Sequence, residues 1–445
     1  MIENSIYEFR YFTCAGQYLF NFDAIESIDF GRAKNEIGMA ELIIPAIYDI
    51  NFFDKDYVLE IWRYNQAKNR TELVGNTCWF LRKIELYMEK IGYEKIKLTF
   101  YDTISLLQRR TVAWFEIKRG TGVDEFIGDY PSGFIEYPDI VVDRIFYHNF
   151  TAAGIVDPIT DPSPGAPFTA NNLHEMVGAP RPGFPISMSN PTFTPRDTTL
   201  SNTETYTFAQ QNCLEAMRSI VDSFETLYNR EMWFDIVYTP STNSTIVGNL
   251  QFNVWLDYPG QDHTFPTGNP PILFGPEFQN ITDASLELDF ENEATQVIAI
   301  NGSVDNTVVG ATNLLDGTTV PSAAGYAERV NADRCRFYPI EAIVSNNTNE
   351  ENTNFQTAAP KIGSILTKAR SELNRLRPKH TLSGDLINSD GAWLFINYQY
   401  GDLVSVNWKR LLFNASIKKI MITYDSKGET VTVPFESSVT TQFLP

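Results

Sequence analysis

The chain has 445 residues, of which 43% are hydrophobic and 20% are charged, so its composition is typical of a folded protein and excludes a disordered chain or a fibrous repeat. Its 55 acidic and 35 basic residues give a formal net charge of −20, which excludes a surface built to grip nucleic acid, because such affinity comes from clustered lysine and arginine. Because domains typically have about 150 residues, we expect this chain to form roughly two to four domains.

The cysteines and the hydrophobic pattern indicate the compartment. Four cysteines lie far apart without a Cys-x-x-Cys pair, which favours a reduced compartment over a disulfide framework or a zinc ribbon; they are Cys14, Cys78, Cys213 and Cys335. No charged and then apolar leader opens the chain, and no run of about 18 apolar residues occurs. We therefore expect neither a signal peptide nor a membrane span.

The first hundred residues predict a β-rich domain. Alternating or β-branched apolar residues indicate four strands, at 39–44, 57–64, 78–88 and 93–100. Residues 89–92 supply a turn, so the last two strands form a long hairpin. The strand 93–100 places Ile96 and Leu98 on one face, and Lys97 and Thr99 on the other. A meander or a small barrel is the natural interpretation.

Helical signals follow the hairpin. Asp102 is suited to cap a short helical turn from which Leu106 and Leu107 point inward. Residues 138–150 predict an amphipathic helix with Pro138 at its first position. Its apolar face repeats at helical spacing, with Val142, Ile145, Phe146 and Asn149.

The middle of the chain changes composition. Residues 151–200 are rich in proline and predict an extended loop. A helix is expected next, with Thr207 and Gln210 as a capping box and a stripe of Leu214, Met217, Ile220, Val221, Phe224 and Leu227. Two strands and a Pro/Gly-rich loop follow, at 232–238, 250–256 and 259–276.

The last third repeats the pattern of the first. Strands are expected around 286–290, where apolar and acidic residues alternate, and at 296–302. Residues 303–330 predict a loop, and 360–376 a helix. The chain closes on three strands, the last two joined by a turn at 425–428; they are 403–408, 417–424 and 430–435.

Residues with catalytic chemistry are sparse. None of the four histidines has a second histidine or a cysteine at ligand spacing; they are His148, His174, His263 and His380. Leu173-His-Glu begins like a zinc protease helix, but the second histidine is missing, so a solvated His174 is favoured. No phosphate-binding loop, dinucleotide fingerprint or nucleophile elbow occurs. We predict no catalytic, cofactor or metal residue, and a protein that is not an enzyme.

Two charged stretches have alternative interpretations. Glu287, Asp289, Glu291 and Glu293 offer carboxylate pairs of the kind that hydrolyse sugar polymers. Because they alternate with Leu288 and Phe290, the solvated face of a strand is the favoured interpretation. The basic stretch 361–379 is read as the solvent side of a helix, with an acidic partner surface as the alternative.

The succession of segments resembles the tail-tip hub proteins of long-tailed bacteriophages, relatives of the baseplate hub in contractile tails. The resemblance covers most of the chain in order and leaves out 151–200 and 303–330. It is carried by a few segments, namely Thr99–Arg110 after the hairpin, the Pro-started helix, Thr295–Gly302, Pro339–Val344, the helix at 360–376 and Tyr400–Val406.

The resemblance implies a mainly β (α+β) fold with two tail-tube-like β-barrel domains. The expected division is 1–115 for the first barrel, 116–280 for a peripheral mixed α/β region, and 281–445 for the second barrel with its helix. It further implies a homotrimeric ring that joins the tail tube or distal tail ring to tip, spike or fibre proteins. Viral DNA would pass through the ring without specific binding, repelled by carboxylates in the lumen. The expected location is the virion tail, assembled in the cytoplasm of the bacterial host.

Two other classes stay open. A host-envelope-degrading tail protein needs an acidic pair or a metal triad. A receptor-binding tail protein needs an exposed recognition surface, and the loop 151–200 is the candidate for it.

Overall fold

The structure is a computed structural model of the chain. It describes residues 7–65, 70–90, 93–112, 114–119, 124–128, 134–135, 137–151, 159–160, 169–172, 186–200, 205–206, 211–268, 270–301, 324–328, 340–346, 369, 371–377, 379–387, 392–409, 411–436 and 442–443. Strands predominate over helices in these residues, so the predicted mainly β fold is confirmed.

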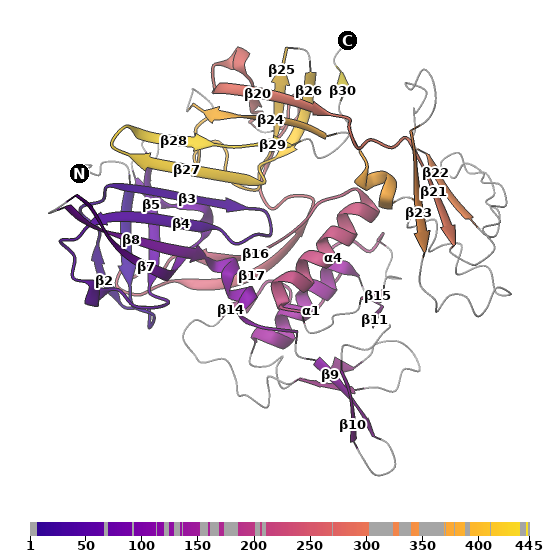
Figure 1. Ribbon diagram of the computed structural model, residues 1–445, viewed down its shortest axis with the longest axis horizontal. Helices are drawn as coiled ribbons and strands as arrows, with labels where there is room; N and C mark the ends of the chain where they lie inside the picture. Colours follow the sequence, from indigo (N-terminus) through magenta and orange to yellow (C-terminus); the bar gives the residue numbers. More distant parts are fainter. Residues whose placement is uncertain are drawn as a thin grey trace. The chain divides into compact units, whose positions relative to one another are not determined.

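The largest sheet has 13 strands among the described residues (Figure 1). Its order is β2 (Tyr18–Asn21), β1 (Tyr7–Phe12), β5 (Val58–Asn65), β7 (Trp79–Lys90), β8 (Tyr93–Asp102), β4 (Met39–Pro45), β3 (Ser27–Ala33), β27 (Lys419–Asp425), β28 (Gly428–Thr432), β24 (Lys379–Leu386) and β20 (Ile281–Asp289). Two short strands flank this path, β6 (Arg70–Leu73) beside β5 and β29 (Phe435–Glu436) beside β24.

Strands from the two ends of the chain join in this sheet. β3 pairs antiparallel with β27, in a register that runs from Ile28 opposite Tyr424 to Ala33 opposite Lys419. Figure 1 shows the indigo and yellow strands side by side. The sheet is strongly curved, because the ring centroids of Tyr7 on β1 and Tyr424 on β27 lie 5.1 Å apart although five strands lie between β1 and β27.

This arrangement bears on the predicted barrels. The strand order is open at both ends in the part of the chain that is described, so a closed barrel is not found there. The two-barrel prediction is therefore not confirmed. The physical reason is that the edges of β3 and β27 form hydrogen bonds with each other. In two separate barrels, each of these edges would instead pair with a strand of its own barrel.

Five smaller sheets complete the described β structure. They are β14 (Ile186–Met188), β17 (Asn249–Leu256) and β16 (Met232–Thr239); β18 (Asp262–His263), β25 (Leu403–Trp408), β26 (Leu411–Ser416) and β30 (Gln442–Phe443) with β19 (Leu273–Phe274) beside β25; β10 (Asp124–Gly128), β9 (Trp114–Arg119), β13 (Thr169–Asn172) and β12 (Ile159–Thr160); β11 (Phe134–Ile135) and β15 (Thr205–Tyr206); and β22 (Ala324–Glu328), β21 (Gln296–Asn301) and β23 (Glu341–Asn346).

The two long helices form where the apolar spacing predicts them. They are α1 (Pro138–Phe150) and α4 (Cys213–Tyr228). α1 packs on the sheet of β14, β17 and β16, where Phe146 stacks on Phe252 with ring centroids 4.1 Å apart. Short 3₁₀ helices lie at Ile50–Phe52, Val74–Asn76, Thr103–Arg109 and Pro276–Phe278.

Some local predictions need correction. α4 is capped by Asn212, whose Oδ1 accepts from the Glu215 N–H at 2.9 Å, and the predicted capping box at 207–210 lies outside the described residues. The predicted loops 151–200 and 303–330 contain four short strands, β12, β13, β14 and β22. These strands have two to five residues, which is too short for an apolar alternation to predict them, and they form by pairing with neighbouring strands. His174 and most of both loops lie outside the described residues.

Contacts divide the chain into two compact units. The first comprises 1–221, 232–285 and 382–445, and the second comprises 222–231 and 286–381. The second unit has a small core of Ala294, Val297, Ala369 and Leu373. Of the predicted helix 360–376, residues 371–375 are helical and 360–368 lie outside the described residues. The predicted boundaries after 115 and 280 stay a prediction.

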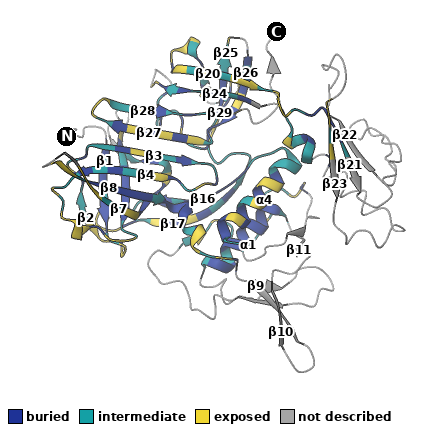
Figure 2. Cartoon of the chain, viewed as in Figure 1, coloured by how far each residue is buried: buried dark blue, intermediate teal, exposed yellow. Residues whose placement is uncertain are grey.

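Alternation along the strands builds the main core, and Figure 2 shows the buried stretches along β8 and β4. Ile96, Leu98 and Phe100 are buried, as predicted for one face of β8. Thr99 on the opposite face is also buried. Leu288 and Phe290 are 40% and 51% exposed, so they are not the core residues that the alternation predicted.

Candidate functional site

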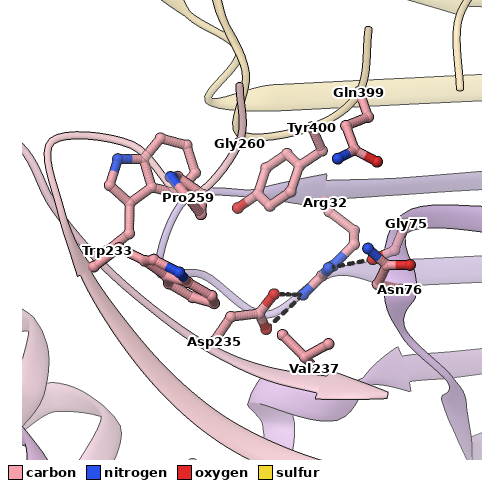
Figure 3. A pocket seen from close by; sticks show the side chains of 11 residues that line it. Arg32, Gly75, Asn76, Trp233, Asp235, Val237, Pro259, Gly260, Gln399 and Tyr400 are labelled. Atoms are coloured by element: carbon pink, nitrogen blue, oxygen red, sulfur yellow. Dashed lines mark hydrogen bonds and ion pairs between the residues drawn. The ribbon is translucent and has the colours of Figure 1, made fainter. Parts of the chain in front are cut away.

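A pocket with a volume of about 90 Å³ lies in the first unit (Figure 3). Segments from the beginning, middle and end of the chain line it. The lining residues are Arg32, Gly75, Asn76, Trp233, Asp235, Val237, Trp255, Pro259, Gly260, Gln399 and Tyr400.

Arg32 is the central residue of this pocket. β3 alternates buried and exposed positions, and Arg32 lies on the same face as the buried Ile28 and Phe30, so a guanidinium points into the interior. Its Nη2 donates to both carboxylate oxygens of Asp235 at 2.7 and 2.8 Å, as Figure 3 shows. Nη1 donates to the Gly75 carbonyl at 2.7 Å. This buried cation is thereby paired with a carboxylate and hydrogen-bonded, which is the condition for keeping it in the core.

Asp102 is the second carboxylate that faces Arg32. It sits at the end of β8, and its Oδ2 accepts from Arg32 Nε at 3.2 Å. The predicted capping role is wrong, because the Asp102 side chain makes no cap hydrogen bond to the 3₁₀ helix Thr103–Arg109. The Ser105 hydroxyl donates to the Asp102 carbonyl instead, at 2.6 Å. The ion pair with Arg32 has replaced the cap.

Burial sets the protonation of this cluster. Asp102 is fully buried, its Oδ1 has no hydrogen-bond partner, and burial raises its pKa to about 6. Burial alone would lower the pKa of Arg32, but Asp235 and Asp102 raise it above its ordinary value, so Arg32 stays charged. The Arg32 guanidinium also lies 5.2 Å from the ring centroid of Tyr400, within cation–π range.

The chemistry available to this pocket is limited. Arg32 already uses four of its five N–H groups on Asp102, Asp235 and Gly75, so one N–H group is left for an anionic substrate. The lining includes no serine, cysteine, histidine or lysine that would serve as a nucleophile or base. The cluster therefore joins β3, β8 and β16 rather than presenting a reactive group.

A second buried ion pair joins distant strands of the large sheet. Arg63 of β5 donates through Nε and Nη2 to Glu429 of β28, at 2.9 and 2.7 Å. The Tyr7 hydroxyl donates to the same carboxylate. These contacts join β1 and β5 to β28 across the concave side of the sheet. They therefore stabilise the curvature of the sheet.

α1 carries a further pair of carboxylates. Asp139 and Asp143 lie one turn apart and share Arg196, whose Nη1 is 3.3 and 2.8 Å from them. Asn190 also donates to Asp143, at 2.8 Å. Burial raises the pKa of Asp143. Both carboxylates bind the chain segment around residue 196 to α1, so this pair also has a structural use.

The described histidines are embedded in the fold. His148 lies buried in α1, and burial lowers the pKa of His380. His263 Nδ1 lies 2.8 Å from the Pro270 carbonyl, and its Nε2 lies 3.6 Å from Asp402, which is buried and accepts backbone N–H groups. No cluster of His, Cys, Asp or Glu with metal-binding geometry occurs among the described residues.

No pattern in the sequence indicates the Arg32 cluster as a set. Arg32 and Asp102 are 70 positions apart, and Arg32 and Asp235 are 203 apart. The one usable sign is that Arg32 alternates in register with the apolar Ile28 and Phe30. In the described part of the chain, no helix is long and apolar enough to cross a membrane.

Comparison with known families gives the class of protein. The model of the Siphovirus ReqiPepy6 Gp37-like protein family matches residues 190–435, more than half of the chain. The chain belongs to this protein family, which is named after a siphovirus, a long-tailed bacteriophage. The predicted resemblance to tail proteins of such phages is confirmed at this level. No curated protein sequence matches the chain.

Several solved structures are similar over nearly the whole length. The tail protein from Neisseria meningitidis MC58 has 9% identity and a TM-score of 0.47, covering 97% of this chain and 96% of that one. The 43 kDa tail protein of prophage MuSo2 from Shewanella oneidensis has 10% identity and a TM-score of 0.48, covering 97% and 98%. The prophage tail protein gp18 from Listeria monocytogenes has 12% identity and a TM-score of 0.45, covering 96% and 94%.

Proposed function

We propose that this chain is a structural component of the phage tail, the central hub of the tail tip, which forms a homotrimeric ring between the tail tube and the tip proteins. The observation that carries the proposal is membership of the siphovirus family over residues 190–435. A hub must resist deformation while the tail engages a cell. The buried Arg32 and Arg63 clusters, which bind distant strands together, support such a role.

The finer architecture belongs to the same proposal. The curved sheet presents open strand edges, and a neighbouring copy in a ring would complete the tube-like barrels that one chain leaves open. The ring would contact the tail tube or distal tail ring on one side and spike or fibre proteins on the other.

The net charge of −20 supports a channel through which DNA passes without binding. Carboxylates in the lumen repel phosphates, and screening confines this repulsion to about 10 Å at moderate salt. We also propose that the chain is not an enzyme. The use of four of the five Arg32 N–H groups within the fold and the shared pairing of Asp139 and Asp143 support this.

The direct test is electron microscopy of virions from the phage that encodes the chain, with the protein located by a bound antibody fragment. The expected result is labelling at the tail tip and a threefold ring with an axial channel. Labelling on the capsid or along the tail shaft would contradict the hub. Release of sugars or peptides from host envelopes by the purified protein would contradict the proposal that it is not an enzyme.

A further inference from the structure

One face of β16 forms a wall of the pocket in Figure 3. Trp233, Asp235 and Val237 alternate along this strand, so their side chains share the face that lines the pocket. Trp255 of β17 lies directly opposite Trp233 in the register of the two strands, so both indoles lie on that face. The pocket therefore has an aromatic wall with a carboxylate beside it.

This wall is held in place by the fold itself. Trp233 is 2% exposed, and its Nε1 donates to the Asp257 carbonyl at 2.9 Å. Its ring meets the ring of Tyr400 edge-on, with centroids 5.5 Å apart. Trp255 is only half-buried, so part of its indole stays accessible from the pocket.

Two loops that are joined to each other form the rim. Asp402 accepts hydrogen bonds from the backbone N–H groups of Gln261 and Gln399, both at 2.7 Å. The Gly260 N–H also donates to the Gly401 carbonyl, at 3.1 Å. The pocket is thus preformed, and a ligand binds without first having to order its walls.

Four polar groups in the lining have no hydrogen-bond partner in the part of the chain that the structure describes. They are the amides of Asn76 and Gln399, the Tyr400 hydroxyl and the Trp255 indole N–H. Figure 3 shows the two amides and the hydroxyl around the same space as the Asp235 carboxylate. These groups offer hydrogen-bond donors and acceptors together, next to an aromatic surface.

The charges of the pocket favour a neutral ligand. The Asp235 carboxylate repels an anion, and Arg32 has one N–H group left to attract one. A cation would meet the Arg32 guanidinium in the same lining. Lys34 adds a second positive charge nearby, with Nζ 5.2 Å from the centroid of the Trp233 ring.

The volume suits a ligand of one ring. By the measure in which one water fills about 10–15 Å³, the pocket of about 90 Å³ holds roughly six to nine waters. Each water takes up about 30 Å³ of liquid, so these waters leave room for roughly 200 Å³ of ligand. That space admits a single hexose and excludes an oligosaccharide.

We propose that this pocket binds one neutral pyranose, either as a free sugar or as the terminal residue of a glycan. The C–H face of the ring stacks on the accessible part of Trp255, and its hydroxyls bond to Asp235 and to the amides of Asn76 and Gln399. A pyranose has one apolar face and a rim of donors and acceptors, which matches this combination of surfaces. The inference goes beyond the proposed hub and does not depend on a ring of three chains.

Saturation-transfer NMR on the purified full chain tests the ligand class. The probes are D-glucose, D-galactose and N-acetyl-D-glucosamine, each as the free sugar and as its methyl glycoside. At least one sugar should receive saturation on its ring protons, whereas acetate and choline, an anion and a cation, should receive none. A methyl glycoside that binds identifies a glycan residue as the ligand, and binding of the free sugar alone identifies a soluble sugar.

Variants of the bound sugar's proposed partners test the site. Asn76→Gly combined with Gln399→Ala should weaken binding about tenfold, because two hydrogen bonds are lost. Glycine suits the φ of 48° at position 76, so the fold should be kept. Trp255→Ala should also weaken binding, and Trp255→Phe should retain most of it. Gln251→Ala is the matched control, since Gln251 is exposed on β17 outside the lining and its loss should change nothing.

The outcomes separate this inference from the proposed function. If none of the sugars binds, if acetate or choline binds instead, or if the amide variants bind a sugar as tightly as the wild type, the pyranose site is overturned. Thermal unfolding at the wild-type temperature verifies that each variant is folded. The location of the chain at the tail tip is tested by the virion label, whose result is independent of sugar binding.

Discussion

Arg32 and Asp102, 70 positions apart in the sequence, are joined by a buried ion pair in which Nε lies 3.2 Å from Oδ2. The side chains of the pair are 6% and 0% exposed. This contact fixes the end of β8 against β3, and Asp235 extends it to β16. Several consequences can be measured.

Replacing Arg32 by methionine should destabilise the protein strongly. The change leaves Asp102 and Asp235 buried without their cation, and removal of one partner from a buried pair costs about 3–5 kcal/mol. Denaturant unfolding measures the effect. Arg82→Met is the control, since Arg82 pairs with Asp56 near the surface, where the loss is about 0–1 kcal/mol. Equal losses for the two variants would contradict the role of Arg32.

Asp102 should make stability depend on pH in an unusual direction. Its pKa is about 6 in the folded chain and 3.8 when unfolded, so between these values the folded chain retains a proton that the unfolded chain has lost. Raising the pH from about 4 to about 6 should therefore lower the free energy of unfolding, by on the order of 3 kcal/mol from this group, and acidification should restore it.

Asp102→Asn should remove that part of the pH dependence. The measurement is the free energy of unfolding at several pH values from 4 to 7, compared with Asp29→Asn on the exposed face of β3. Burial also raises the pKa of Glu60, Asp143 and Asp402. These three groups therefore also lower the free energy of unfolding as the pH rises, and both variants keep this contribution. If the free energy of unfolding changes with pH equally in Asp102→Asn and the wild type, the pH dependence does not come from Asp102.

Arg63 and Glu429 should show coupling in a double-mutant cycle. Their side chains are 9% and 10% exposed, and the pair is bidentate, so a coupling energy of roughly 1–3 kcal/mol is expected. The cycle uses Arg63→Met, Glu429→Gln and the double variant, followed by thermal unfolding. Additive effects would mean that β5 and β28 are held together by other contacts.

Gly260→Ala should disturb the rim of the pocket. A Cβ at this position would lie 2.0 Å from Asp402 Oδ1, the oxygen that accepts from the Gln261 N–H. Asp402 must move or the loop must shift, at a cost of about 1–3 kcal/mol. Gly428→Ala is a useful contrast, because its Cβ meets nothing within 4 Å and only the φ of 116° opposes it. A neutral Gly260→Ala variant would show that the loop adapts freely.

Local patterns in the sequence predicted eleven of the 30 described strands and both long helices. The alternation in 93–100 and the spacing in 138–150 are properties of neighbouring residues, so they predict β8 and α1 without knowledge of the rest. The hairpin of β27 and β28 follows from its turn in the same way. The order of such segments also predicted the resemblance to phage tail proteins.

The pairing of distant strands was decided only by the tertiary structure. Nothing in the spacing of 27–33 indicates that β3 pairs with β27 nearly 400 residues later, because an apolar strand face fits many partners equally well. The same holds for Asp102: its sequence context predicts a helix cap, but a buried arginine nearby binds the carboxylate more strongly than backbone N–H groups do. Electrostatics between residues far apart in sequence overrode the local preference.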